Sequence, residues 1–175
     1  MGVGAGMAIN HEAWNMKHYL KQKGISVVEV IIAIAVVSTV FFAIAQVSIL
    51  ALRASADRNT KAKALAIAQE GMEATRSIRD ASWTTNIAGL TFAATYYITA
   101  SSSQWTLTQA NPGLIENKFT RTVILDNVSR NINDDIVDTG GTNDIYTKKI
   151  TVTVSWGSQG KSMKLAGYIM DILKN

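Results

Sequence analysis

Glu29 is the residue with the most unusual chemical setting in the sequence. It lies in an apolar segment that follows Gly24, and no other charged residue occurs from Val30 to Leu52. A charged side chain near the centre of a bilayer costs about 2.5–3.5 kcal/mol on insertion scales. The position of this carboxylate therefore requires an explanation, and a partner of opposite charge is the simplest one.

A second group of carboxylates surrounds the Gly140-Gly141 pair. It comprises Asp134, Asp135, Asp138 and Asp144. Oxygen-rich loops can bind calcium, which makes calcium the one candidate cofactor, but the spacing matches no EF-hand loop. Acidic, glycine-containing surface turns are common, so the sequence favours a solvated loop over a calcium site.

Other kinds of catalytic and metal chemistry lack the residues they need. The chain has no cysteine, and its two histidines, His11 and His18, both precede the apolar segment. This composition excludes a disulfide framework, a thiol nucleophile and a histidine-based catalytic or zinc site in the region that follows. No nucleophile–base pair, phosphate-binding loop or paired-carboxylate site stands out, and we expect that the protein is not an enzyme.

The net charge of +4 gives little reason to expect nucleic-acid binding. Three lysines, Lys17, Lys21 and Lys23, precede the apolar segment, and the remaining basic residues are interspersed with acids. The sequence thus lacks the basic stripe that a phosphate backbone requires.

Two helical segments follow a basic leader, residues 1–24. Residues 25–52 form an uninterrupted apolar segment without proline, and about 20 such residues suffice for a helix to cross a bilayer. The leader lysines predict that the N-terminal side of this helix is cytoplasmic. At 175 residues the chain has room for one modest domain in addition to this segment.

Residues 53–82 are predicted to continue the helix with one apolar face. In this segment Leu65, Ala68, Met72 and Thr75 recur at helical spacing. Apolar or small residues flank them at Ala64, Ile67, Gly71, Ala74 and Ile78. We therefore expect one nearly continuous helix whose first half is apolar all round and whose second half is amphipathic.

Residues 83–175 change to the two-residue period of β-strands. The clearest case is Ile150 to Trp156, where apolar residues alternate with threonine and serine, and Gly157 to Gly160 then predicts a hairpin turn. Phe119 to Leu125 is a further strong candidate. Four strands packed on the amphipathic helix would give a small antiparallel β-sheet domain of the α+β class.

Three interpretations of the apolar segment remain open, and each gives a different mature N-terminus. A single-pass anchor would keep the leader. A secretory signal peptide would be cut before Gln46, because Ala43-Ile44-Ala45 satisfies the small-x-small rule. The third interpretation comes from a resemblance.

The segment Gly24-Ile25-Ser26-Val27-Val28-Glu29, followed by an apolar helix, resembles the processing motif of type IV pilins and of the related pseudopilins of type II secretion. The resemblance implies that a prepilin peptidase cuts after Gly24 and that Ile25 becomes the mature, methylated N-terminus. Ile25 stands where the family most often has phenylalanine. The family's glutamate corresponds to Glu29, which would pair with the N-terminus of a neighbouring subunit and set the register of assembly.

The resemblance also implies a biological setting. The chain would be a structural subunit of a type IV pilus or a type II secretion pseudopilus, a minor pilin or pseudopilin and not a major one. Its partners would be other pilin subunits, the prepilin peptidase, an inner-membrane assembly platform and membrane lipid. It would first span the bacterial cytoplasmic membrane once, with its C-terminal domain outside, and later enter an extracellular or periplasmic filament. The alternative is an anchored or secreted β-domain that binds a ligand or surface partner without polymerising.

Overall fold

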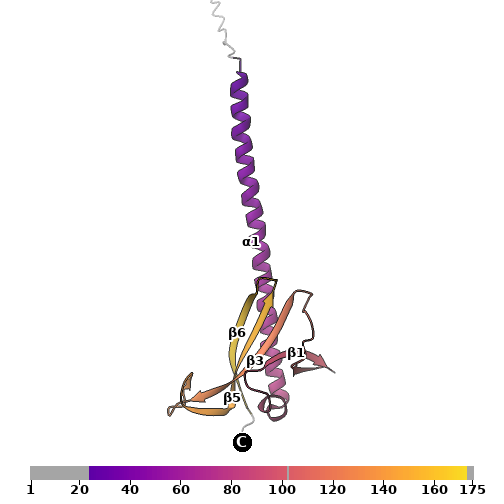
Figure 1. Cartoon of the computed structure of the whole chain (residues 1–175), viewed down its shortest axis with the longest axis vertical. Helices are drawn as coiled ribbons and strands as arrows, with labels where there is room; N and C mark the ends of the chain where they lie inside the picture. Colours follow the sequence, from indigo (N-terminus) through magenta and orange to yellow (C-terminus); the bar gives the residue numbers. More distant parts are fainter. Residues whose placement is uncertain (1–23, 102, 173–175) are drawn as a thin grey trace, which may run out of the picture. The chain divides into compact units, whose positions relative to one another are not determined.

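The computed structural model describes residues 24–101 and 103–172 (Figure 1). It divides into two units, one that ends at Ile49 and one that begins at Leu50, and each is described by itself. The predicted leader, including Lys17, Lys21 and Lys23, lies outside the described residues except for Gly24.

A single helix, α1 (Val27–Ala81), accounts for 55 residues and passes through both predicted helical segments. It begins two residues later than predicted because Ser26 caps its N-terminus. The Ser26 hydroxyl accepts a hydrogen bond from the Val28 N–H at 3.3 Å. Serine is favoured at this capping position, where its oxygen satisfies a backbone donor that has no partner within the helix.

The remaining elements belong to the second unit. A short π-helical turn, η1 (Thr84–Ala88), follows the helix. The strands are β1 (Thr95–Ser101), β2 (Gln104–Thr108), β3 (Phe119–Arg130), β4 (Ile136–Val137), β5 (Thr142–Trp156) and β6 (Lys161–Met170). They form one antiparallel sheet in the order β2-β1-β3-β5-β6, with β4 paired to β3. The α+β fold predicted from the sequence is confirmed, with six strands in place of four.

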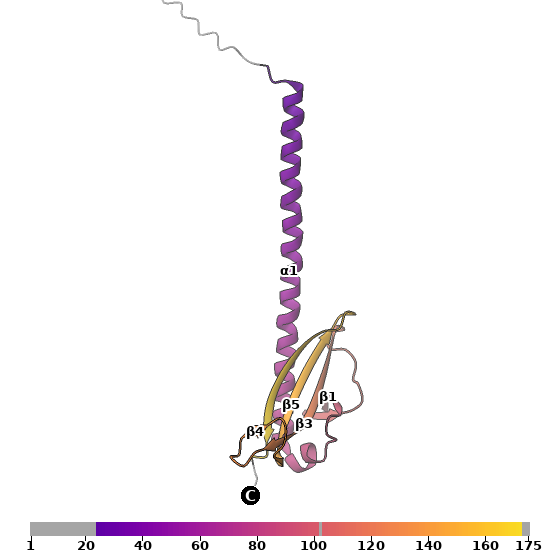
Figure 2. The same ribbon diagram turned by 60° about the vertical axis from the view of Figure 1, so that its left-hand side comes forward.

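The core lies between the second half of α1 and one face of the sheet, and Figure 2 shows β5 and β6 running beside this part of the helix. Pairing of β3 with β5 places Val123 opposite Val152 and Leu125 opposite Ile150, and all four side chains are buried. Met163 and Leu165 of β6 pack against this core, as the predicted hairpin required. The alternation in the sequence therefore identifies the buried faces of β3 and β5 correctly.

The buried face of α1 differs from the prediction at one position. Its buried residues are Ala64, Ile67, Ala68, Gly71, Met72, Ala74, Thr75 and Ile78. Leu65, assigned to the apolar face from its spacing, is 39% exposed. Successive residues of a helix point about 100° apart, and Ala64 rather than Leu65 faces the sheet because its small side chain permits close packing.

Gly71 marks the closest approach of helix and sheet. A Cβ atom at this position would lie 2.8 Å from Cδ of Arg121 on β3 and 3.0 Å from Cγ1 of Val152 on β5. Arg121 is itself buried, and its Nη1 lies 3.2 Å from Glu70 Oε1 and 3.3 Å from the Ile67 carbonyl oxygen. Glycine at position 71 thus makes room for a buried guanidinium that ties α1 to β3.

We expect Gly71→Ala to lower the free energy of unfolding by about 1 kcal/mol. Overpacking a core costs about 1–3 kcal/mol, and the roughly 1 kcal/mol that alanine gains over glycine in a helix offsets part of that cost. Thermal unfolding of the full chain in detergent micelles measures the effect. Gly89→Ala is the matched control, because a Cβ there meets no atom within 4 Å. A Gly71→Ala variant as stable as the control would contradict the proposed close contact.

Candidate processing and assembly site

The segment from Gly24 to Glu29 leads into α1: residues 24–26 have no regular secondary structure, and the helix begins at Val27. Gly24 has no left-handed φ angle, and a Cβ atom built on it meets nothing within 4 Å. Ile25 is 74% exposed. Among the described residues, no contact of the fold requires glycine at position 24. The small size of this residue could therefore serve a protease that recognises the Gly24–Ile25 bond.

Ser26 has a structural role that the sequence analysis missed. Its carbonyl oxygen accepts a hydrogen bond from the Glu29 N–H at 3.0 Å, in addition to the hydroxyl contact with Val28. The spacing of Ser26 and Glu29 is that of a capping box, a signal that the sequence contains. The reciprocal bonds of the box are not formed: the Ser26 hydroxyl accepts from Val28 and not from Glu29. Within the described residues, no hydrogen bond joins the Glu29 carboxylate to the Ser26 N–H.

The Glu29 side chain is exposed on the first turn of α1. Within residues 24–101 and 103–172, its carboxylate makes no hydrogen bond or ion pair. The position is favourable for an acid, since the N-terminus of a helix carries a partial positive charge. The carboxylate is therefore available to a partner outside the described residues.

The apolar half of α1 has every side chain exposed from Gly24 to Ala56. It includes a segment long and apolar enough to cross a membrane once. Its hydroxyl groups suit such an environment: Thr39 and Ser48 each donate a hydrogen bond of 2.9 Å to the carbonyl oxygen four residues earlier. Internal pairing of polar groups is what a bilayer demands of a spanning segment, so this half of the helix is compatible with a single membrane span.

Two of the carboxylates around Gly140-Gly141 lie near Arg130, a residue that the sequence analysis did not single out. The Arg130 Nε donates to Asp144 Oδ2 at 2.8 Å and lies 3.6 Å from Asp134 Oδ1, and its Nη1 donates to the Asp134 carbonyl oxygen at 2.8 Å. Asp135 instead accepts from the Asn131 amide at 3.3 Å, and Asp138 is exposed. Arg130 thus supplies a positive charge beside two of the four carboxylates considered for calcium.

The four calcium candidates are not brought together. In the part of the chain that the structure describes, no group of three or more histidine, cysteine, aspartate or glutamate side chains is arranged to hold a metal ion. Asp144, expected in a loop, lies in β5, which begins at Thr142, eight residues before the start of the predicted alternation at Ile150. Pairing of β3 with β5 continues past a β-bulge after Asn127. The sequence there has no alternation of apolar and polar residues, so this extension of the strands could not be predicted.

Asp144 is held in its charged form by this arrangement. Burial by itself would raise the pKa of Asp144, but hydrogen bonds from the Thr147 hydroxyl and Arg130 outweigh burial and lower the pKa to about 2. The Tyr146 N–H also donates to Asp144 Oδ1 at 2.9 Å. The charged carboxylate therefore stabilises the fold where β3 ends and β5 begins.

Comparison of the chain with protein-family models, with curated proteins and with solved structures finds no match. The resemblance to type IV pilins thus depends on residues 24–29, the apolar helix and the fold class.

We expect acid to destabilise the domain through Asp144 between about pH 4 and about pH 2. Its pKa in the folded state is below the value of about 3.9 for an unfolded aspartate, so the stabilisation is present above about pH 4 and is lost as the pH falls. The contribution should be about 1 kcal/mol, the scale of partly exposed ion pairs. Melting temperatures of Asp144→Asn measured from pH 6 to pH 2 should fall less steeply than those of the wild type. Asp138→Asn is the control, and an identical pH dependence in all three proteins would argue against this role.

Proposed function

We propose that the protein is a pilin-like subunit that is cut after Gly24 and polymerises through its N-terminal helix. The observation that carries the proposal is the arrangement at the start of α1: an exposed Gly24–Ile25 bond, a serine-capped helix, and an acid without a partner among the described residues, followed by an apolar helix. Each of these features suits a segment that is processed first and buried between subunits later.

Cleavage gives Glu29 a partner. Hydrolysis of the Gly24–Ile25 bond would create a positively charged α-amino group on Ile25. A carboxylate and an ammonium group that are withdrawn from water together are tolerated when paired, whereas either one alone is costly. The amino group of one subunit and Glu29 of its neighbour would form this pair, which fixes the axial register between helices.

The apolar half of α1 has to stay out of water both before and after assembly. Its exposed side chains include Ile31, Phe41, Phe42 and Leu50, each more than 60% exposed. Burial of such a side chain contributes about 1.5–3 kcal/mol relative to its exposure to water. Lipid covers these residues before assembly and neighbouring helices cover them afterwards, so the same segment serves as a membrane anchor and as a filament core.

The rival interpretations fit this arrangement less well. Cleavage before Gln46 would fall within the continuous helix α1, and a protease would have to unwind that helix to reach the bond. A permanent anchor leaves the position of Glu29 without a function. An anchored or secreted β-domain remains the alternative that the N-terminus of the mature protein distinguishes.

We expect the mature protein to begin at Ile25 when the chain is produced in bacteria that contain a prepilin peptidase. Intact-mass and N-terminal peptide measurements identify the new terminus and any added methyl group. Gly24→Val should reduce processing by about tenfold or more, because pockets built for a small residue reject larger ones. It should leave the fold intact, because a Cβ atom at this exposed position meets nothing within 4 Å. A mature N-terminus at Gln46, or an intact leader in the wild type, would refute the proposal.

We expect Glu29→Ala to insert into the membrane and to be cleaved normally but to enter filaments poorly. The carboxylate is needed only when the neighbour's amino group must be neutralised away from water. The ratio of the variant in sheared filaments to that in the membrane fraction measures the effect. Glu29→Gln tests the charge alone, and Glu73→Ala removes an exposed acid from another part of the same helix. Incorporation of Glu29→Ala at the wild-type level would exclude the register role.

A further inference from the structure

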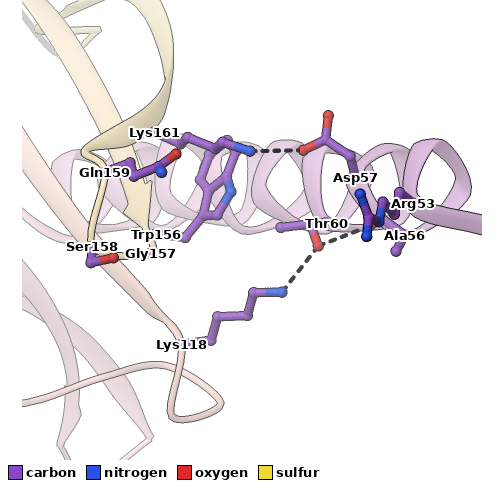
Figure 3. Close-up of a pocket in the computed structure, with 10 residues that line it drawn as sticks. All are labelled: Arg53, Ala56, Asp57, Thr60, Lys118, Trp156, Gly157, Ser158, Gln159 and Lys161. Atoms are coloured by element: carbon purple, nitrogen blue, oxygen red, sulfur yellow. Dashed lines mark hydrogen bonds and ion pairs between the residues drawn. The ribbon is translucent and has the colours of Figure 1, made fainter. Parts of the chain in front are cut away.

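A groove lies at one end of the second unit, between α1 and the β5–β6 hairpin, with a volume of about 460 Å³. Figure 3 shows Arg53, Asp57 and Thr60 on the helix side, facing Lys118 and Lys161 from the sheet side. The Gly157–Gly160 turn, which is exposed, completes the lining with Ser158 and Gln159. Three cations and one carboxylate therefore line an open groove.

The single acid of the groove is already neutralised. Asp57 Oδ2 lies 2.8 Å from Lys61 Nζ, and Asp57 Oδ1 lies 3.3 Å from Lys161 Nζ. Hydrogen bonds from Lys61 and Lys161 lower the pKa of Asp57 below its usual value. One carboxylate shared by two lysines leaves positive charge in excess before Arg53 and Lys118 are considered.

Arg53 and Lys118 are the cations that remain available. Within the described ranges, neither forms an ion pair. Lys118 Nζ donates to the Thr60 hydroxyl at 3.0 Å and lies 5.6 Å from the centre of the Phe119 ring. A hydroxyl and a ring leave the lysine charge uncompensated, so the groove offers charge complementarity to an anion, with hydroxyl and amide groups nearby as hydrogen-bond donors.

The position of the groove in the chain favours a lipid headgroup as this anion. Arg53 is the first charged residue after the apolar run Val30–Leu52, where basic residues extend towards the headgroup region of a bilayer. Leu114, which is 58% exposed, lines a neighbouring hollow together with Lys118. Cations beside an exposed apolar side chain fit the boundary between lipid headgroups and water.

We propose that this groove binds the phosphate of an anionic phospholipid on the outer face of the membrane, with Arg53 and Lys118 as the principal contacts. The inference rests on the membrane-embedded state in the proposed function. Headgroup binding would hold the domain against the bilayer until the subunit leaves it for the filament.

The test uses the full chain in uncharged detergent micelles, titrated with short-chain phosphatidylglycerol. Amide chemical shifts of Gly157 and Ser158 report occupancy of the groove. We expect phosphatidylglycerol to bind at least about tenfold more tightly than short-chain phosphatidylcholine, and the double variant Arg53→Gln/Lys118→Gln to lose about tenfold or more in affinity, since each basic residue near an anionic surface contributes about 1 kcal/mol.

Matched controls separate this site from net charge. Lys149→Gln/Lys164→Gln removes the same charge from residues that do not line the groove, and it should bind as the wild type does. Equal loss in both double variants, equal binding of the two lipids, or stronger binding of inorganic phosphate or of a hexaglutamate peptide than of phosphatidylglycerol would overturn the inference.

The outcome can be distinguished from that of the processing experiment. Cleavage after Gly24 with no lipid preference would refute the groove alone. Lipid preference in a chain whose mature N-terminus is not Ile25 would refute the pilin proposal and leave the headgroup site standing.

Discussion

The rest of the structure depends on one helix, α1, whose two halves lie in different surroundings. The second half packs on the β-sheet, whereas the first half is apolar and exposed. The backbone groups of α1 are hydrogen-bonded within the helix except at its ends, so the body of both halves can leave bulk water without unpaired donors and acceptors. The two halves differ in the exposure of their side chains. From residue 24 to 56 every side chain is exposed, and only beyond that point does one face become buried against the sheet. The apolar half therefore needs a cover that the described part of the chain does not supply.

The second half shows how small residues let this helix approach the sheet closely. Its buried face is rich in alanine and glycine, and Arg121 of β3 fills the space that Gly71 leaves. The guanidinium spans this contact, with Nη1 near both the Glu70 carboxylate and the Ile67 carbonyl oxygen, while its buried Nε has no hydrogen-bond partner among the described residues. Small residues bring the backbone close to the sheet, and a single long polar side chain fixes the relative position of helix and strand.

Charges placed along the chain give each end of the molecule a separate role in the proposed function. Glu29 forms no ion pair with the described residues, whereas Asp144 and Asp134 both form ion pairs with Arg130 in their own domain. Arg53 and Lys118 present positive charge where the apolar segment gives way to the domain. In the proposed function this pattern suits a subunit that moves from lipid to filament, because the charges that stabilise the fold are paired internally and those proposed for assembly or lipid binding are not.

Much of this architecture could be read from local pattern. The charge-free run to Leu52, the alternation from Ile150 to Trp156 and the glycines of the following turn predicted the helix and the hairpin, because their periods match the geometry of the elements they form. No local pattern predicted the exposure of Leu65 or the extension of β3 and β5 past Asn127. Nor did any pattern predict that Arg130 lies beside Asp144, or that Arg53 and Lys118 line one groove. These features arise when residues distant in the chain are brought together, and close packing and ion pairing between them depend on distances that only the tertiary structure sets.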